Sequence, residues 1–222
     1  MSDTIYPPTA AFAASAHADK AIYEAMYAAS IADPESFWDA QGKRLDWITP
    51  YSKVKDTTFE HSGVSIKWYE DGVLNVSANC IDRHLATRGN QTAIIWEGDN
   101  PEESAHITYT QLHAEVCKLA NVYKSLGVSK GDRVVLYMPM IPEAAYAMLA
   151  CNRIGAVHSI VFGGFSPEAL AARITACGAK LIVTADRVVS PGEFRALGPP
   201  TGIPGHLADA IVEAPFGAHP QG

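Results

Sequence analysis

The stretch RVVLYMPMIPEAAYAMLACNRIGAVHSIVFGGFSPEALAARITACGAKLIVT, residues 133–184, decides the fold. Its apolar runs at 133–138, 156–161 and 180–184 show almost no polar alternation, as expected of strands that are covered on both faces. Between them lie two segments that each have proline in the first turn and glycine at the end, the usual punctuation of a helix. Strand and helix alternating over some fifty residues predict parallel strands with right-handed crossovers, and so a doubly wound α/β sheet.

The residues before this stretch contain further elements. The sequence predicts a helix from about Ser77 to Thr87 and strands at Ala93–Glu97 and His106–Tyr109. Thr110 is a good N-cap for a following helix that ends near Gly127. The apolar positions of that helix step by 4, 3, 4 and 3 residues through Leu112, Val116, Leu119, Tyr123 and Leu126.

Composition divides the chain into four parts. Residues 1–20 are rich in alanine and are expected to form a mobile arm. Residues 21–75 are aromatic and predict an N-terminal extension of short helices and loops. Residues 76–186 hold the first part of the sheet domain. Residues 187–222 hold 12 Pro or Gly in 36 positions, which predicts a disordered tail.

The totals exclude several classes of protein. A formal net charge of -7 gives no basic field for nucleic acid. The four cysteines form no CxxC pair and are interpreted as buried free thiols in a reducing compartment, so no zinc site is expected. The first twenty residues have no basic flank before an apolar core, so no signal peptide is expected and the cytoplasm is the predicted location.

One segment raises the question of a membrane span. Val134–Cys151 is 18 residues long and carries only Glu143 as a charge. Pro139 and Pro142 within it fit a strand, a turn and a buried helix better than a continuous transmembrane helix. We therefore expect no contact with membranes.

The junction Phe162-Gly163-Gly164 is the strongest candidate site. It lies where a strand ends and a helix begins, so backbone N–H groups and the helix N-terminus could face an anion or a nucleotide. The alternative is a plain tight turn, because the chain has neither GxGxxG nor GxxxxGK[ST]. The eight histidines show no metal-binding spacing, and no Ser, His and Asp set can be assembled, so we expect structural histidines, no metal site and no catalytic residue.

Longer segments carry a family resemblance. They are ESFWDAQGKRLDWITPYSKV (35–54), SIKWYEDGVLNVSANCIDRHL (65–85), TAIIWEGD (92–99) and the run from ITYTQL to ALAARI (107–174). Together and in this order they closely resemble the N-terminal part of the AMP-forming acetyl-coenzyme A synthetases, the acetate:CoA ligases of the adenylate-forming superfamily. The resemblance covers about residues 23–186.

The resemblance implies a function and its cofactors. Such ligases use ATP with Mg²⁺ to convert acetate to acetyl-adenylate and diphosphate, and then pass the acetyl group to CoA, releasing AMP. In that family the Phe-Gly-Gly turn borders the CoA nucleotide, so Phe162, Gly163 and Gly164 become candidate CoA-binding residues. The implied partners are the small molecules acetate, ATP and CoA.

The sequence also departs from the family pattern after Asp186. Family members continue with an Arg-x-Gly-Arg element that contacts CoA, and then carry a phosphate loop, an acetate pocket and a catalytic lysine; this sequence contains none of these. We therefore expect an N-terminal fragment, from an interrupted reading frame or a truncated gene, that is inactive by itself and makes only part of the CoA contacts.

The sequence also allows other interpretations. The chain could be a fragment of a propionate:CoA ligase, since the residues that size the acyl pocket are not in it. It could also be a non-catalytic stub that associates with full-length subunits, because an uncovered parallel sheet edge favours association. An unrelated nucleotide-binding oxidoreductase would need a glycine fingerprint that is missing here.

Overall fold

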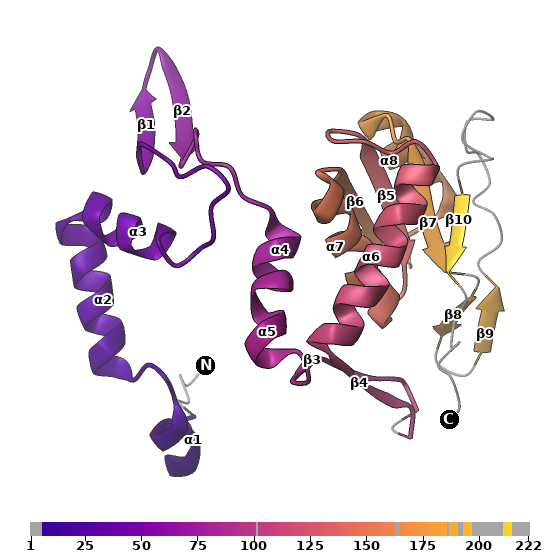
Figure 1. Ribbon diagram of the computed structural model, residues 1–222, viewed down its shortest axis with the longest axis horizontal. Helices are drawn as coiled ribbons and strands as arrows, with labels where there is room; N and C mark the ends of the chain where they lie inside the picture. Colours follow the sequence, from indigo (N-terminus) through magenta and orange to yellow (C-terminus); the bar gives the residue numbers. More distant parts are fainter. Residues whose placement is uncertain are drawn as a thin grey trace, which may run out of the picture. The chain divides into compact units, whose positions relative to one another are not determined.

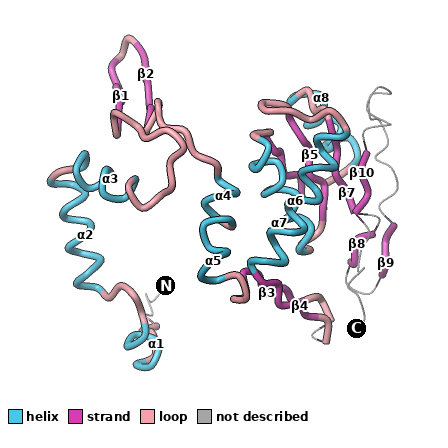
Figure 2. The backbone as a smooth tube through the Cα atoms, in the orientation of Figure 1, coloured by secondary structure: helices cyan, strands magenta, loops and turns pink. Residues whose placement is uncertain are grey.

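The computed structural model describes residues 6–100, 102–162, 165–185, 187–190, 193–196 and 211–214. The chain divides into two compact units, Met1–Leu74 and Asn75–Gly222. Figure 1 labels the elements along the chain, and Figure 2 separates helices from strands and loops.

The first unit consists of three helices followed by a hairpin. Its elements are α1 (Ala10–Ser15), α2 (Lys20–Ala32), α3 (Pro34–Gly42), β1 (Lys55–Glu60) and β2 (Gly63–Trp68). Asp33 begins α3 by accepting a hydrogen bond from the Ser36 amide, and Pro34 follows in the first turn. In Figure 2 a long loop leads from α3 to the antiparallel β1–β2 hairpin. The sequence had predicted only short helices and loops here, and the hairpin was missed.

Aromatic rings pack the loop and the hairpin of this unit together. The Trp47, Tyr51 and Tyr69 rings have centroids 4.6 to 5.6 Å apart. The Tyr51 hydroxyl donates to Asp39 Oδ1 at 2.8 Å. Burial first, and then this carboxylate, raise the pKa of Tyr51 to about 12. A Cβ at Gly72 would lie 2.5 Å from the Trp47 ring, so this position requires glycine.

The second unit begins with short elements that precede the sheet. They are α4 (Val76–Cys80), a 3₁₀ turn (Asp82–His84), α5 (Leu85–Arg88), β3 (Thr92–Glu97) and β4 (Ser104–Thr108). The helix predicted from about Ser77 to Thr87 is present as three short helical elements, which are interrupted where the buried Ile81 leaves helical geometry with φ −123° and ψ −66°. The two predicted strands are present as the antiparallel pair β3–β4.

The sheet domain follows, with its parallel core. Its elements are α6 (Tyr109–Ser125), β5 (Arg133–Met138), α7 (Pro142–Ile154), β6 (Val157–Phe162), α8 (Pro167–Cys177), β7 (Leu181–Ala185), β8 (Arg187–Ser190), β9 (Glu193–Ala196) and β10 (Ile211–Ala214). The strand order β10-β7-β5-β6 is parallel throughout, and β10 lies beside β7 in Figure 1. The predicted α/β class and parallel sheet are confirmed.

The two faces of β5 pack against different helices, as a doubly wound sheet requires. Val134, Leu136 and Met138 belong to the core cluster that includes α6 and α7. Val135 and Tyr137, which alternate with them, belong to the cluster that includes Leu170 and Ile174 of α8. The apolar character of this strand therefore comes from cover on both sides.

Two details differ from the sequence-based expectations. Thr108, rather than Thr110, is the N-cap of α6: its Oγ1 accepts from the Gln111 amide while the Gln111 side chain accepts from the Thr108 amide. Among the cysteines only Cys151 is buried; Cys80 is exposed, and Cys117 and Cys177 are partly exposed.

The tail of residues 187–222 is described only at β8, β9 and β10. Strand β8 pairs with β9 in antiparallel orientation, and β10 pairs with β7 in parallel orientation. These three strands lie within a segment whose composition predicts disorder. The other tail residues lie outside the described part of the chain, so the expectation for them stays a prediction.

Candidate functional site

The candidate site lies where β5 and β6 end. The strands pair in parallel with Met138 opposite Phe162, so their carboxyl ends meet at one edge of the sheet, where ligands bind in such folds. Val161 is buried against α8, whereas the next side chain, Phe162, is 69% exposed. Met140, just after β5, is also exposed, and its carbonyl accepts a hydrogen bond from Trp96 Nε1 at 2.8 Å. This edge therefore presents apolar side chains to solvent.

A second aromatic ring stands next to Phe162. The Phe165 ring meets the Phe162 ring edge to face, with centroids 6.2 Å apart and planes at 89°. The Phe165 amide donates to the Phe162 carbonyl at 3.0 Å, which links the backbones of the two residues. The pair offers an exposed ring in a defined orientation, which suits a planar heterocycle.

Two residues from outside the turn contact Phe165. The Tyr137 hydroxyl, from β5, donates to the Phe165 carbonyl at 3.2 Å. The Arg173 guanidinium, from α8, lies 4.3 Å from the centroid of the Phe165 ring, and its Nη1 donates to the Ala169 carbonyl. The sequence pointed to neither residue, because no local pattern indicates that Tyr137, Phe165 and Arg173 meet.

Helix α8 begins beside this pair. Ser166 is its N-cap, and its Oγ accepts from the Ala169 amide at 3.4 Å, as the sequence predicted. A hydrogen bond from its own amide, and then the Ser166 side chain, lower the pKa of Glu168. Gly163 and Gly164, the other two predicted CoA-binding residues, lie outside the described residues, so their role stays a prediction.

A second cluster contains the residue types of a catalytic triad. His113 Nε2 lies 3.5 Å from Asp82 Oδ1 and 3.5 Å from Cys117 Sγ. A relay needs the two ring nitrogens to face different partners, but here the same nitrogen faces both groups. The Asp82 carboxylate is, moreover, engaged by the Arg153 guanidinium. We interpret the cluster as structural.

One histidine does not fit the structural role expected of it. His158 Nδ1, on β6, is buried and has no hydrogen-bond partner within the described part of the chain. Burial lowers the pKa of this imidazole, because the charged form loses hydration. A structural histidine would be expected to hydrogen-bond through this nitrogen, and His158 Nδ1 does not do so within the described residues.

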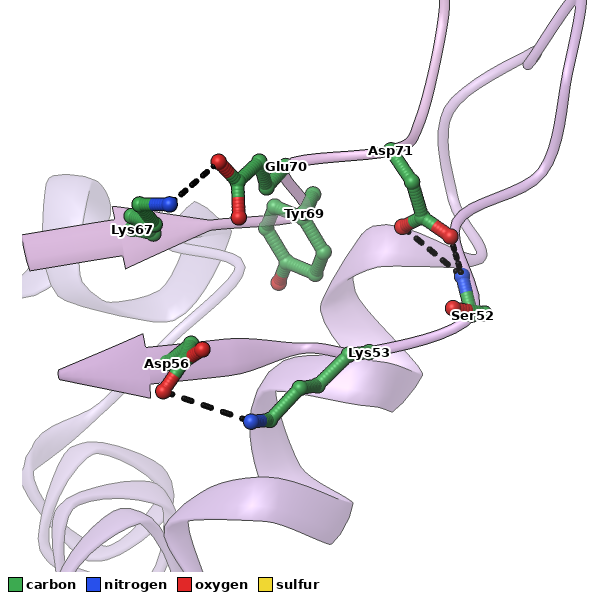
Figure 3. Close-up of a pocket in the computed structure, with 7 residues that line it drawn as sticks. All are labelled: Ser52, Lys53, Asp56, Lys67, Tyr69, Glu70 and Asp71. Carbon is green, nitrogen blue, oxygen red and sulfur yellow. Dashed lines mark hydrogen bonds and ion pairs between the residues drawn. The ribbon is translucent and has the colours of Figure 1, made fainter.

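A hollow of about 220 Å³ lies in the first unit and is drawn in Figure 3. Its lining residues are Ser52, Lys53, Asp56, Lys67, Tyr69, Glu70 and Asp71. Lys53 pairs with Asp56 at 3.3 Å, and Lys67 pairs with Glu70 at 2.6 Å. Both ammonium groups therefore face carboxylates, and the hollow offers no uncompensated positive charge to select an anion.

The described residues contain neither a cluster of metal ligands nor a helix that could span a membrane. Within residues 6–100, 102–162 and the shorter described segments, no three His, Cys, Asp or Glu side chains gather as metal ligands would. Across the same residues, no helix combines the length and apolar character that a membrane crossing requires. Val134–Cys151, the segment that raised this question, divides into β5, a turn and part of α7.

Comparisons with known proteins give consistent matches. Residues 81–210 match the family model for the AMP-binding enzyme, and residues 23–80 match that for the acetyl-coenzyme A synthetase N-terminus. An acetyl-coenzyme A synthetase of Methylocella silvestris is 66% identical over 186 residues, which are 84% of this chain and 29% of that protein. One from Methylorubrum extorquens is 64% identical over 192 residues, 86% of this chain and 29% of that protein. This chain thus spans less than a third of the length of these relatives.

Proposed function

The chain belongs to the AMP-binding enzyme family, and on that premise we propose that it forms the N-terminal part of an acetate:CoA ligase. The proposed overall reaction joins acetate, ATP and CoA to give acetyl-CoA, AMP and diphosphate. Acetate first displaces diphosphate from ATP to form acetyl-adenylate, and the CoA thiol then displaces AMP. The agreement of both family models and of the named relatives supports this assignment.

The contribution that we propose for this chain is to bind CoA at the edge of the sheet after β6. The observation that carries this proposal is the exposed ring of Phe162 beside Phe165 at that edge. An exposed aromatic face favours stacking with a base such as adenine. The adjacent N-terminus of α8 favours a negatively charged group such as a phosphate. Gly163 and Gly164 would let the ligand approach the backbone closely.

We propose that parts of the ligase other than the described residues of this chain bind ATP and form acetyl-adenylate. Mg²⁺ would accompany ATP there and neutralise charge on its phosphates. We propose that the 222 residues alone do not form acetyl-adenylate, and that the cytoplasm is their location. The share of the relatives that the chain spans, 29 to 30%, supports the first point. Acetate-dependent exchange of labelled diphosphate into ATP by the purified chain would contradict it.

CoA binding is best tested by isothermal titration of the purified chain. Phe162→Ala removes the exposed ring and should weaken CoA binding about tenfold, since a base stacked on an aromatic side chain contributes about 1 to 3 kcal/mol. Phe59→Ala is the matched control, because Phe59 is 73% exposed on the β1–β2 hairpin of the other unit. If wild type and Phe162→Ala bind CoA with equal affinity, the proposed CoA site beside Phe162 is rejected.

A second proposed role is association with full-length subunits of the same family. Strand β6 is at the edge of the four-stranded sheet among the described residues, and it exposes Val157, Ile160 and Phe162. Exposed apolar side chains on an unpaired edge favour pairing with another chain. Co-expression with a full-length relative, followed by light scattering after size exclusion, should then show a mixed complex. Elution of two separate species would contradict it.

A further inference from the structure

The position of Phe165 is fixed by residues of two other elements. Tyr137 lies on β5 and is only 9% exposed. Its hydroxyl donates a hydrogen bond to the Phe165 carbonyl. Arg173 covers the Phe165 ring from α8, and its hydrogen bond to the Ala169 carbonyl fixes where the guanidinium lies. The residue is therefore held at its backbone by the sheet and at its ring by the helix.

This arrangement has a consequence for Phe162. An exposed phenylalanine at the end of a strand has several rotamers open to it. The Phe165 ring restricts them, because it meets the Phe162 ring edge to face at 89°. Whatever fixes Phe165 therefore also fixes the orientation in which the Phe162 ring faces solvent.

We infer that Tyr137 and Arg173 are positioning residues that hold the Phe162–Phe165 pair in its ligand-ready orientation before a ligand arrives. The ligand class is a planar purine carrying phosphate, and this inference rests on the proposed function in taking that ligand to be CoA. Holding a binding side chain in place beforehand raises affinity, because less side-chain freedom is lost on binding.

The free protein provides the first test. In the wild-type chain, the Phe165 ring current should shift the side-chain proton resonances of Arg173 upfield in NMR spectra. Tyr137→Phe removes one hydroxyl and keeps the buried ring, and it should reduce that shift. Tyr123→Phe is the matched control: the Tyr123 hydroxyl is buried and has no partner within the described residues, so its loss should leave the Arg173 resonances unchanged.

Titration with CoA provides the second test. Tyr137→Phe and Arg173→Gln should each weaken CoA binding about fivefold, the effect of losing one ordinary hydrogen bond or one exposed cation–π contact. Arg173→Lys keeps the charge but loses the flat guanidinium, so it should recover only part of the affinity. Arg88→Gln, at an exposed arginine of α5, controls for the change in net charge.

A double-mutant cycle separates positioning from a general loss of stability. If Tyr137 acts through Phe162, adding Tyr137→Phe to Phe162→Ala should weaken CoA binding no further. Additive losses, an absent ring-current shift in the wild type, or single variants that bind CoA like the wild type would each overturn the inference. If the wild type shows the shift but binds no CoA, the proposed function fails, whereas the positioning of Phe165 by its neighbours is supported.

Discussion

The Arg153 guanidinium and the Asp82 carboxylate form two hydrogen bonds, with Nη1 3.2 Å from Oδ1 and Nη2 2.6 Å from Oδ2. The contact joins α7 to the 3₁₀ turn, and the Arg153 side chain is only 21% exposed. Asp82→Asn should lower the free energy of unfolding by about 2 kcal/mol, because it leaves a partly buried guanidinium without its counter-charge. Urea unfolding followed by circular dichroism measures this.

A surface pair supplies the control for that change. Lys118 and Glu115 lie one helical turn apart on α6, and their side chains are 70% and 43% exposed. Breaking this pair with Lys118→Gln should cost less than about 0.5 kcal/mol, since exposed ion pairs are screened by solvent. Equal losses in both variants would mean that the Asp82–Arg153 contact is no stronger than a surface pair.

The acid dependence of stability should reflect Asp132. Its carboxylate accepts hydrogen bonds from Lys180 Nζ at 2.9 Å and from the amide and hydroxyl of Ser129 at 2.8 Å each. The Lys180 contact first, and then Ser129, hold the pKa of Asp132 at about 2, below the ordinary value of 3.8. The pKa of Asp132 is therefore lower in the folded state than in the unfolded state. The stabilisation that the Asp132 carboxylate gives the fold is full above about pH 4 and disappears as the pH falls toward 2.

Asp132→Asn should therefore be less stable than wild type at neutral pH, and the difference should shrink between about pH 4 and pH 2. Lys180→Gln removes the largest cause of the lowered pKa, so it should also weaken the acid dependence. Urea midpoints measured across this pH range provide the comparison. A difference between wild type and Asp132→Asn that stays constant over the range would contradict the assignment.

Local signals made the sheet domain predictable. The bounds of β5, Arg133–Met138, agree with the sequence prediction, because the strand is apolar on both faces and proline follows directly. Helix α8 also begins where predicted, since Ser166 and Pro167 form a complete start signal. By contrast, the β1–β2 hairpin was missed although Val64, Ile66 and Trp68 alternate with polar residues along β2, because the aromatic content of this part of the chain was taken to indicate short helices and loops.

The candidate site was only partly predictable, because its contacts join residues on different elements. Phe162 stands next to two glycines in the sequence, and a family resemblance marks it. Tyr137 and Arg173 lie on other elements, and they reach Phe165 only because β5 and α8 pack against each other. Such contacts depend on the packing of the sheet against the helix, which no spacing in the sequence expresses.

The N-cap of α6 offers a test of local helix energetics. Thr108→Ala should lower the free energy of unfolding by about 1 kcal/mol, because the Gln111 amide loses its acceptor. Thr108→Ser retains the hydroxyl and should be close to wild type. Because the Gln111 side chain also accepts from the Thr108 amide, the losses in Thr108→Ala and Gln111→Ala should not add. Additive losses in urea unfolding would mean that the two bonds form independently.

The cysteines should differ in reactivity according to their exposure. Cys80 is exposed, whereas Cys151 is fully buried in α7, and burial raises the pKa of the Cys151 thiol to about 12. The thiolate is the species that reacts with iodoacetamide, so Cys151 lacks both access and the reactive form. Peptide mass spectrometry after brief alkylation of the native chain should find Cys80 modified and Cys151 intact. Alkylation in urea should label both, and equal labelling of the two in native buffer would contradict the burial of Cys151.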